Sequence, residues 1–439
     1  MKIALISLGC PKNQVDADIL CRALLAAGHT TTPEVAEADC IIVNTCGFIQ
    51  PAKEEAIEQI LAACALKKQN PALKVVVTGC LAERYRAEIR TEIPEVDAVV
   101  GLGSNAALPA ILERLEATGA AAECYGPKTA LPLGGPRVIS TPAHYAYLKI
   151  AEGCSNGCYY CAIPLIRGPM RSRPLKDCLA EARWLAEQGV RELILVAQDP
   201  TAYGEDTGQN RLCELLAGLD EVEGIEWVRI LYAYPERITD ELVAAMARSP
   251  KVVPYLDLPI QHCSDEVLRR MNRRGGRAAI EAALARLRAG IPGIALRTTL
   301  LVGYPGESEA QFEELCGFVR AQQFDRLGCF AFSPEEGTVA ARLPDDVSEE
   351  EKQRRVDVIM RIQAEITAQK QAQRVGSTLR VLCDGYDEES GLWLCRSAAD
   401  APEIDTNVCV QSETPLTPGA FYEVLVEESD VYDLYGRLA

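Results

Sequence analysis

Residues 151–161 read AEGCSNGCYYC and place three cysteines, Cys154, Cys158 and Cys161, on one short loop directly after a β-rich segment. Three thiolates this close together can bind three irons of a cubane iron–sulfur cluster and leave the fourth iron without a protein ligand. A structural zinc site is the alternative, but a closed zinc site takes four ligands, usually from a second pair of cysteines. No such pair follows nearby, so the spacing favours a redox cluster with one open iron.

An open iron of this kind can chelate the amino and carboxylate groups of S-adenosylmethionine (SAM). Electron transfer from the cluster into the sulfonium would then cleave SAM to a 5′-deoxyadenosyl radical. The loop therefore predicts radical chemistry, in which the protein binds and orients the groups that react.

The loop lies at the start of a run of strand–helix units, which is typical of an incomplete parallel barrel whose reactive end lies at the C-terminal ends of the strands. The expected strands lie near Tyr145–Ile150, Glu192–Ala197, Trp227–Tyr232, Val253–Pro259, Ile294–Val302 and Leu327–Phe332. Residues 348–374 are polar with apolar residues at helical spacing, so we expect a helix that packs along this barrel.

Alternating strands and helices also fill the N-terminal segment, which predicts an open parallel α/β sheet. Its expected strands are Lys2–Leu8, Cys40–Val43, Lys74–Thr78 and Asp97–Val100. Three of them are followed by a cysteine: Cys10, Cys46 and Cys80. Because the C-terminal ends of parallel strands share one edge, we expect these thiols to converge and bind a second cluster with an open iron. The alternative is three buried cysteines without a ligand role, as expected for Cys21 and Cys64 within helical patterns.

The fold class is therefore α/β with a small β-barrel at the end. Residues 1–125 are expected to form the sheet domain with the auxiliary cluster, and 126–142 a linker rich in turn formers. Residues 143–374 are expected to form the partial barrel and its trailing helix. Residues 375–439 alternate as short strands, which predicts a small antiparallel β-barrel.

Several residues of the cysteine loop and the expected strand ends could bind SAM: Tyr160, Gln198, Gln261, Arg297, Gly303 and Gly306. The two glycines would let the backbone approach a flat ring, or would only allow a turn. Arg297 lies within a strand, where a buried charge needs a partner, so the SAM carboxylate and a structural ion pair are both open. No catalytic side chain is assigned beyond the cluster ligands, and His262 at the rim is not named as one.

Arg167, Arg171 and Arg173 follow the cysteine loop closely. They could bind an anionic substrate or SAM, because guanidinium groups pair well with carboxylates and phosphates. The alternative is a basic loop exposed to solvent.

The composition is that of a globular protein of 439 residues with 18 cysteines and a formal net charge of −18. Because no secretory signal or membrane span is recognisable, a cytoplasmic location is expected, where cysteines favour metal or redox chemistry over disulfides. The negative charge favours a basic protein partner over a phosphate backbone. Residues 371–439 have four basic and thirteen acidic side chains, and the difference of −9 is half of the total.

Over essentially its whole length the sequence resembles the radical-SAM methylthiotransferases, which combine a three-cysteine domain, a radical-SAM barrel and a TRAM-like barrel. One branch of this family modifies the base next to a tRNA anticodon, and the other modifies an aspartate of ribosomal protein S-twelve. The chain is similar to the second branch at SLGCPKN (7–13), RGPMRSR (167–173), LPIQH (258–262) and APEID (401–405). It lacks the Gln-Met-Asn that usually follows the first cysteine of the tRNA branch. Ala17 stands where the family tends to have serine, away from any expected ligand.

The resemblance implies that the chain adds a methylthio group to the β-carbon of an aspartate in ribosomal protein S-twelve. It implies two [4Fe–4S] clusters, SAM, a reductant protein and a sulfur donor, with no membrane partner and no tRNA substrate. One SAM would methylate a sulfur at the Cys10, Cys46 and Cys80 cluster, and a second would yield the radical that attacks the unactivated C–H bond. The alternatives are a tRNA adenosine methylthiotransferase and a non-enzymatic iron–sulfur protein that binds RNA.

Overall fold

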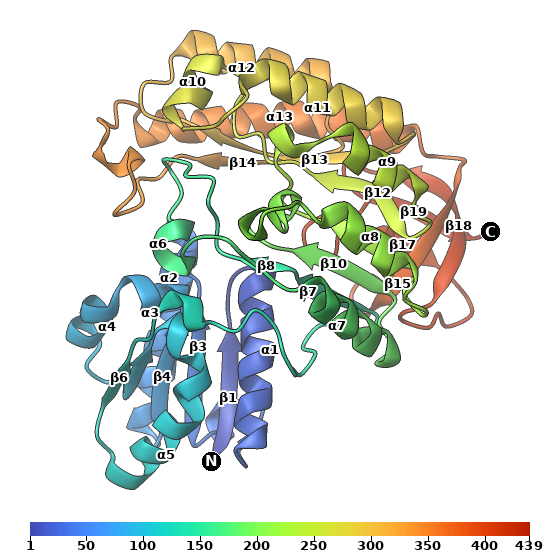
Figure 1. Ribbon diagram of the computed structural model, residues 1–439. Helices are drawn as coiled ribbons and strands as arrows, with labels where there is room; N and C mark the ends of the chain where they lie inside the picture. The colour runs from blue at the N-terminus through green and yellow to red at the C-terminus, as the bar shows by residue number, and fades with distance from the viewer. The chain divides into compact units, whose positions relative to one another are not determined.

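The computed structural model describes residues 1–439, which form two compact units (Figure 1). The first unit comprises residues 1–140, 149–173 and 333–341, and the second comprises residues 141–148, 174–332 and 342–439. The three-cysteine loop at 154–161 therefore belongs to the same unit as the N-terminal sheet. No helix of the chain is both long and apolar enough to cross a membrane.

A six-stranded parallel sheet with the order β2-β1-β3-β4-β5-β6 forms the centre of the first unit. Its strands are β1 (Lys2–Ser7), β2 (Thr30–Thr31), β3 (Cys40–Thr45), β4 (Lys74–Gly79), β5 (Ala98–Val100) and β6 (Ala122–Cys124). The helices are α1 (Pro11–Ala26), α2 (Gln50–Ala65), α3 (Cys80–Arg84), α4 (Arg86–Glu92), α5 (Leu108–Thr118) and α6 (Ile163–Arg167). Strands β8 (Ala151–Glu152) and β9 (Arg171–Ser172) form a small antiparallel pair at the base of the cysteine loop.

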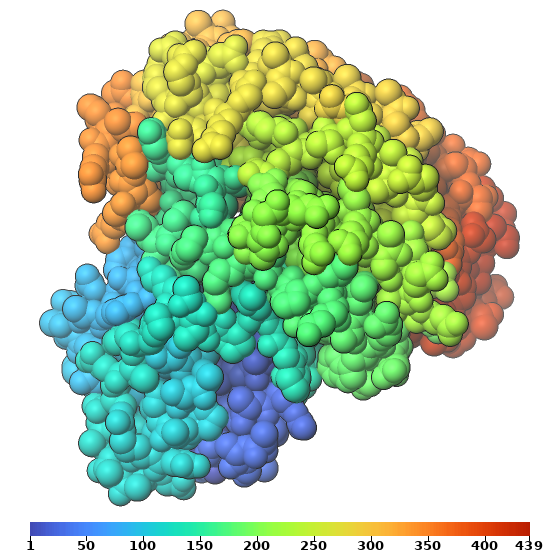
Figure 2. Space-filling view, viewed as in Figure 1, coloured from blue at the N-terminus to red at the C-terminus, as the bar shows by residue number.

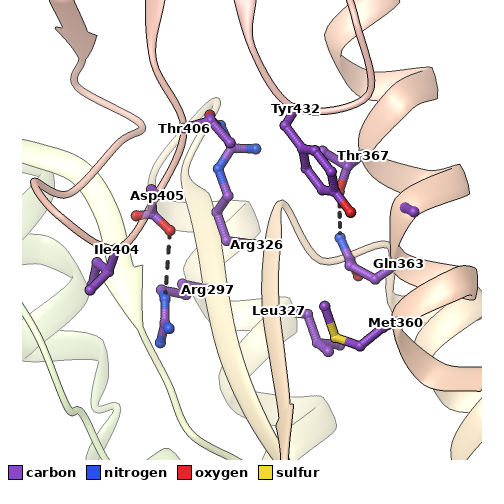
Figure 3. Close-up of a pocket in the computed structure, with 11 residues that line it drawn as sticks. Arg297, Arg326, Leu327, Met360, Gln363, Thr367, Ile404, Asp405, Thr406 and Tyr432 are labelled. Atoms are coloured by element: carbon purple, nitrogen blue, oxygen red, sulfur yellow. Dashed lines mark hydrogen bonds and ion pairs between the residues drawn. The ribbon is translucent and has the colours of Figure 1, made fainter. Parts of the chain in front are cut away.

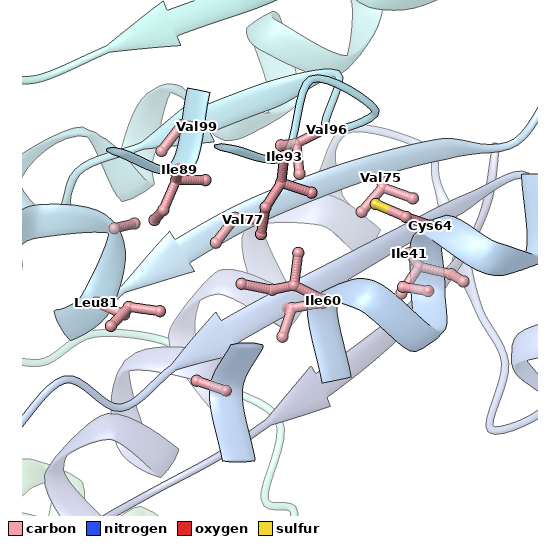
Figure 4. Close-up of a cluster of buried hydrophobic side chains, with 14 of the residues drawn as sticks. Ile41, Ile60, Cys64, Val75, Val77, Leu81, Ile89, Ile93, Val96 and Val99 are labelled. Atoms are coloured by element: carbon pink, nitrogen blue, oxygen red, sulfur yellow. The ribbon is translucent and has the colours of Figure 1, made fainter. Parts of the chain in front are cut away.

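Helices cover both faces of this sheet because its strands are apolar on both sides, as is usual for parallel sheets. Ile41 of β3 packs in one cluster with Ile60 of α2 (Figure 4). The next residue, Ile42, points to the opposite face and packs with Leu20 of α1. Each buried aliphatic side chain of this kind contributes roughly 1.5–3 kcal/mol relative to exposure. The two layers together fix the strand ends that lead into the cysteine-bearing loops.

The second unit contains a six-stranded sheet with the order β14-β13-β12-β11-β10-β7, in which β10 to β14 pair in parallel. The strands are β7 (Tyr145–Lys149), β10 (Glu192–Val196), β11 (Trp227–Ile230), β12 (Val252–Asp257), β13 (Ala295–Val302) and β14 (Arg326–Ala331). The helices are α7 (Leu175–Glu187), α8 (Leu212–Asp220), α9 (Asp240–Arg248), α10 (Asp265–Arg270), α11 (Gly276–Gly290), α12 (Glu309–Gln322) and α13 (Glu349–Ala372). In the space-filling view, α9, α11 and α12 form a continuous outer layer (Figure 2). The sheet and its helices confirm the predicted partial barrel.

A closed five-stranded barrel with the order β15-β16-β17-β19-β18 ends the chain. Its strands are β15 (Thr378–Asp387), β16 (Leu392–Ser397), β17 (Val408–Gln411), β18 (Phe421–Ser429) and β19 (Leu434–Leu438). The segment between β16 and β17 contacts the large sheet of the same unit. Asp400 pairs with Arg326 at the start of β14, and Asp405 accepts a hydrogen bond of 2.7 Å from Tyr255 of β12.

Candidate functional site

The three N-terminal cysteines lie at one edge of the first sheet, as predicted. Cys10 follows β1, Cys46 follows β3, and Cys80 follows β4, and these three strands are neighbours in the order β1-β3-β4. The chain runs from β1 to its neighbour β2 on one side and returns to β3 on the other. Cys10 and Cys46 therefore flank the point where the strand order reverses, which is where open α/β sheets bind ligands.

Glycine precedes four of the six predicted cluster ligands and has a positive φ in each case. Gly9, Gly79, Gly153 and Gly157 have φ values of 93°, 95°, 76° and 71°. A Cβ at Gly9 would lie 2.7 Å from Cys46 Cβ, and a Cβ at Gly79 or Gly153 would collide with a backbone carbonyl oxygen. At Gly9, Gly79 and Gly153 glycine is therefore required both for the turn and for the close approach of two chain segments.

Cys10, Cys46 and Cys80 form the first cysteine set, and their thiols lie close enough to influence one another's pKa. Burial raises the pKa of Cys80 to about 12, against the opposing charge of Arg167, and the nearby Cys46 and Cys10 raise it further. Burial also raises the pKa of Cys46, with a further contribution from Cys10. Metal binding to such a site releases protons, because only thiolates are ligands.

The second cysteine set lies on a loop that is braced from both sides. Cys154 N–H donates to the carbonyl oxygen of Gly168 at 3.1 Å, and Cys161 N–H donates to that of Cys158 at 3.1 Å. Met170 N–H donates to Ser155 Oγ at 3.1 Å. The three thiols are partly exposed.

One buried cluster of the first unit joins Cys80 to the segment that follows the second cysteine set. Cys80 packs with Ala162, which directly follows Cys161, and with Ile166 of α6. Lys53 and Arg84 both pair with the buried Glu335, at 3.1 and 2.7 Å, so the segment 333–341 also belongs to this unit. Sequence reasoning missed Glu335, which is distant in the chain from both of its partners.

Four buried charges lie next to these cysteines and were not predicted as a group. Arg167 Nη1 pairs with Asp16 at 2.9 Å and with Glu152 at 2.8 Å. Lys149 also pairs with both carboxylates. All four side chains are at most 1% exposed, and although burial disfavours the Glu152 anion, Arg167 and Lys149 lower its pKa. Two cations thus balance two carboxylates in the interior of the unit.

The expected role of the three arginines after the loop has to be corrected. Arg167 is buried against carboxylates of this chain, so it is neither a solvated residue nor an open substrate contact. Arg171 donates to the carbonyl oxygen of Thr129 at 2.7 Å, and Arg173 donates to that of Lys149 at 2.8 Å. These side chains brace the loop because backbone carbonyls and carboxylates of the first unit accept their hydrogen bonds.

The residues proposed from the sequence to contact SAM fall into both units. Tyr160 lies in the first unit, and Gln198, Gln261, Arg297, Gly303 and Gly306 lie in the second.

Gln261 has a left-handed φ of 68°, and its backbone forms hydrogen bonds with Thr299 and Leu301 of β13. A Cβ at Gly303 would collide with the Lys352 side chain. His262 is fully buried, and its Nδ1 accepts a hydrogen bond of 2.9 Å from Ser264 N–H.

Arg297 already has partners within the second unit. It pairs with Asp257 at 2.9 Å and with Asp405 at 3.6 Å. Figure 3 shows Arg297 and Asp405 beside a cavity of about 160 Å³ that Arg326 and Tyr432 also line. The structure therefore has the ion pair that was the alternative to a SAM contact.

The residues present fit iron–sulfur clusters. Sulfur donors that follow the ends of three neighbouring strands, and a second set on a braced loop, are the ligands such clusters use. No three His, Cys, Asp or Glu side chains converge on one point where a single metal ion would bind. In a cubane cluster each cysteine binds a different iron.

Family models match most of the chain in three sections. Residues 2–101 match the uncharacterised protein family UPF0004, 148–319 match the radical SAM superfamily, and 375–439 match the TRAM domain. Membership of the radical SAM superfamily implies SAM and a [4Fe–4S] cluster.

Solved structures share the fold. The radical SAM methyltransferase TsrM of Kitasatospora setae has a TM-score of 0.56 at 13% identity, with 75% of this chain and 74% of TsrM covered. The cobalamin-dependent radical SAM enzyme OxsB has a TM-score of 0.53 at 12% identity, with 82% and 56% covered. Identities this low show the fold alone.

Relatives match along the full length. The ribosomal protein uS12 methylthiotransferase RimO of Pelotomaculum thermopropionicum is 46% identical over 439 residues, which cover 100% of this chain and 99% of the relative. The RimO proteins of Acetivibrio thermocellus and Clostridioides difficile are 46% and 45% identical, with 100% and 99% of this chain and 98% of each relative covered. The chain belongs to the RimO family of radical-SAM methylthiotransferases.

Proposed function

We propose that this chain adds a methylthio group to the β-carbon of an aspartate in ribosomal protein uS12, using SAM and two [4Fe–4S] clusters. The observation that carries the proposal is the presence of two three-cysteine sets in one compact unit, with Cys80 packed against Ala162 beside Cys161. The name and full-length similarity of the RimO relatives support uS12 as the substrate.

Each set of cysteines has a separate role in this proposal. Cys154, Cys158 and Cys161 bind the cluster at which SAM is cleaved, and the first set, Cys10, Cys46 and Cys80, binds the cluster that carries the sulfur to be transferred. Bound clusters of this kind supply electrons and an iron with a free coordination position. The chain supplies the thiolates, the glycine turns that precede four of them, and the packing of Cys80 against Ala162 beside Cys161.

The proposed SAM site and the partner proteins complete this function. Tyr160, Gln198, Gln261, Gly303 and Gly306 are proposed to line the SAM site, and Arg297 is left out because two carboxylates of the chain already pair with it. A reductant protein and a sulfur donor are required by the chemistry. A cytoplasmic location is part of the same proposal.

The test is anaerobic reconstitution with iron and sulfide, followed by incubation with SAM, a reductant and either uS12 or a tRNA anticodon arm. We expect 5′-deoxyadenosine, and a mass gain of one methylthio group on a uS12 peptide that contains aspartate. A uS12 variant with this aspartate changed to alanine is the control and should gain nothing. Modification of the tRNA instead, or an iron-loaded protein that forms no 5′-deoxyadenosine, would contradict the proposal.

A further inference from the structure

Arg167 is one of the residues that connect the two cysteine sets of the first unit. It ends helix α6, which follows Cys161, and its side chain is fully buried. The carbonyl oxygen of the next residue, Gly168, accepts the hydrogen bond from Cys154 N–H. Its guanidinium reaches in the other direction, towards Cys80.

The two edges of the guanidinium have different partners. Nη1 donates to Asp16 and Glu152, at 2.9 and 2.8 Å. Nη2 donates to Asn13 Oδ1 at 3.3 Å and lies 3.5 Å from Cys80 Sγ, within hydrogen-bond reach of sulfur. The carboxylates thus fix the plane of the guanidinium while the second edge is directed at the thiol.

An ion-pair role alone does not account for this arrangement. Asp16 and Glu152 each also pair with Lys149, so both carboxylates have a second cation. If Arg167 only neutralised these carboxylates, its guanidinium would not need to direct an N–H at Cys80 Sγ. In the dry interior a fixed N–H and a positive charge act strongly on a neighbouring anion, because the effective dielectric constant is low.

We propose that Arg167 is a positioning residue that donates a hydrogen bond to the sulfur of Cys80 and raises the reduction potential of the cluster bound by Cys10, Cys46 and Cys80. The inference rests on the proposed function, which places a cluster there. Reduction adds negative charge to a cluster, and hydrogen bonds to ligand sulfurs together with nearby positive charge stabilise that charge. Loss of Arg167 should therefore make this cluster harder to reduce.

The experiment isolates the cluster in question. The full chain is prepared with Cys154, Cys158 and Cys161 all changed to Ala, so that only the first set can bind iron. In this background the midpoint potential is measured by anaerobic redox titration with electron paramagnetic resonance, for Arg167 and for Arg167→Met. We expect a shift to a more negative potential in Arg167→Met.

A matched control comes from the same unit. Arg137 pairs with Asp18 of helix α1 at 2.8 Å and is also buried, so Arg137→Met removes a comparable ion pair. Its cluster should keep the potential of the background protein. Arg167→Gln, which keeps an N–H donor and removes the charge, should give a smaller negative shift, and it takes the place of Arg167→Met if that variant fails to fold.

The outcomes separate this inference from the proposed function. A background protein that binds no iron overturns both, because no cluster is then present at the first set. A background protein that binds iron, but whose potential is the same with Arg167, Met or Gln, overturns the role of Arg167 alone. An equal shift in Arg137→Met shows a general effect of lost packing and also overturns it.

Discussion

Asp257 and Arg297 are register partners on the neighbouring strands β12 and β13, and their side chains form an ion pair of 2.9 Å. The second carboxylate oxygen of Asp257 accepts a hydrogen bond of 3.1 Å from the backbone N–H of Tyr232. Tyr232 has a left-handed φ of 67°, which is rare for a residue with a side chain. Asp257 thus stabilises both a partly buried cation and a strained turn after β11.

Arg297→Ala is expected to lower the free energy of unfolding by about 3–5 kcal/mol, because it leaves the buried Asp257 without its cation. Chemical denaturation measures this change. Arg286→Ala, which removes an exposed pair with Asp240, is the control and should cost less than about 1 kcal/mol. If Arg297→Ala is as stable as the parent but binds SAM more weakly, Arg297 is a SAM contact after all.

Changing the cysteines should separate two activities. Alanine at Cys154, Cys158 or Cys161 is expected to abolish 5′-deoxyadenosine formation, because the iron that chelates SAM is lost. Alanine at any residue of the first set, Cys10, Cys46 and Cys80, should spare 5′-deoxyadenosine and stop methylthio transfer. Iron analysis and product chromatography are the measurements. Cys64→Ala, in helix α2, should keep the full iron content, and a first-set variant that also keeps it refutes the ligand assignment.

Gly79→Ala should remove iron from the first set without changing any ligand. A Cβ at Gly79 would collide with the Thr45 carbonyl oxygen, so β4 and Cys80 would have to move away from β3. Gly28→Ala is the matched control, since Gly28 also has a positive φ, 87°, but has open space around it. Both variants are strained, and only Gly79→Ala is expected to lose iron. Equal iron contents would show that the position of Cys80 tolerates the shift.

The free energy of unfolding of the second unit should fall at acid pH, because Glu192 becomes protonated. Burial opposes ionisation of Glu192, but Arg396 and Arg229 overcome this effect and lower its pKa. A carboxyl with a lowered folded-state pKa stabilises the fold above its unfolded value of about 4.3, and this contribution is lost as the pH falls below that value. Denaturation curves from pH 6 down to about pH 3 should show a shallower pH dependence for Glu192→Gln than for the parent. Glu388→Gln, at an exposed site, should follow the parent.

The acidic surface of the terminal barrel is expected to speed capture of a basic substrate protein. Glu388, Glu389, Glu427 and Glu428 are exposed, and changing all four to Lys should slow association with uS12, most clearly at low salt. Stopped-flow binding at two salt concentrations measures the effect. 5′-Deoxyadenosine formation should be unaffected. An association rate equal to that of the parent would leave solubility as the role of these charges.

The sequence was sufficient for the parts of the fold that depend on local pattern. The apolar run expected at Lys74–Thr78 predicted strand β4, which in the structure extends to Gly79, and the position of Cys80 after such a run predicted the shared sheet edge. The short edge strands β2 and β6 were missed because neither has the continuous buried apolar run that marks the equally short β5. Helix α5 was missed as well, although its apolar residues follow helical spacing.

Contacts between distant side chains could not be predicted in the same way. The partners of Arg167 depend on packing between Asp16 and a loop that begins far along the chain. A charged residue such as Lys149, at the end of the otherwise apolar and fully buried strand β7, was the one available signal that a buried ion pair would be needed. The pairing of Arg297 with Asp405 likewise required the terminal barrel to be in place.

The discontinuous first unit has a consequence for biosynthesis. Its residues come from 1–140, 149–173 and 333–341, so the ribosome makes the N-terminal sheet long before the last segment of the same unit. During that interval Lys53 and Arg84 lack Glu335, and before residue 167 is made Asp16 lacks Arg167. Since domains generally fold from the N-terminus as they are synthesised, the sheet with Cys10, Cys46 and Cys80 emerges first. Iron supplied before synthesis is complete would thus meet the sheet edge before Glu335 has joined Lys53 and Arg84, and these contacts would form last.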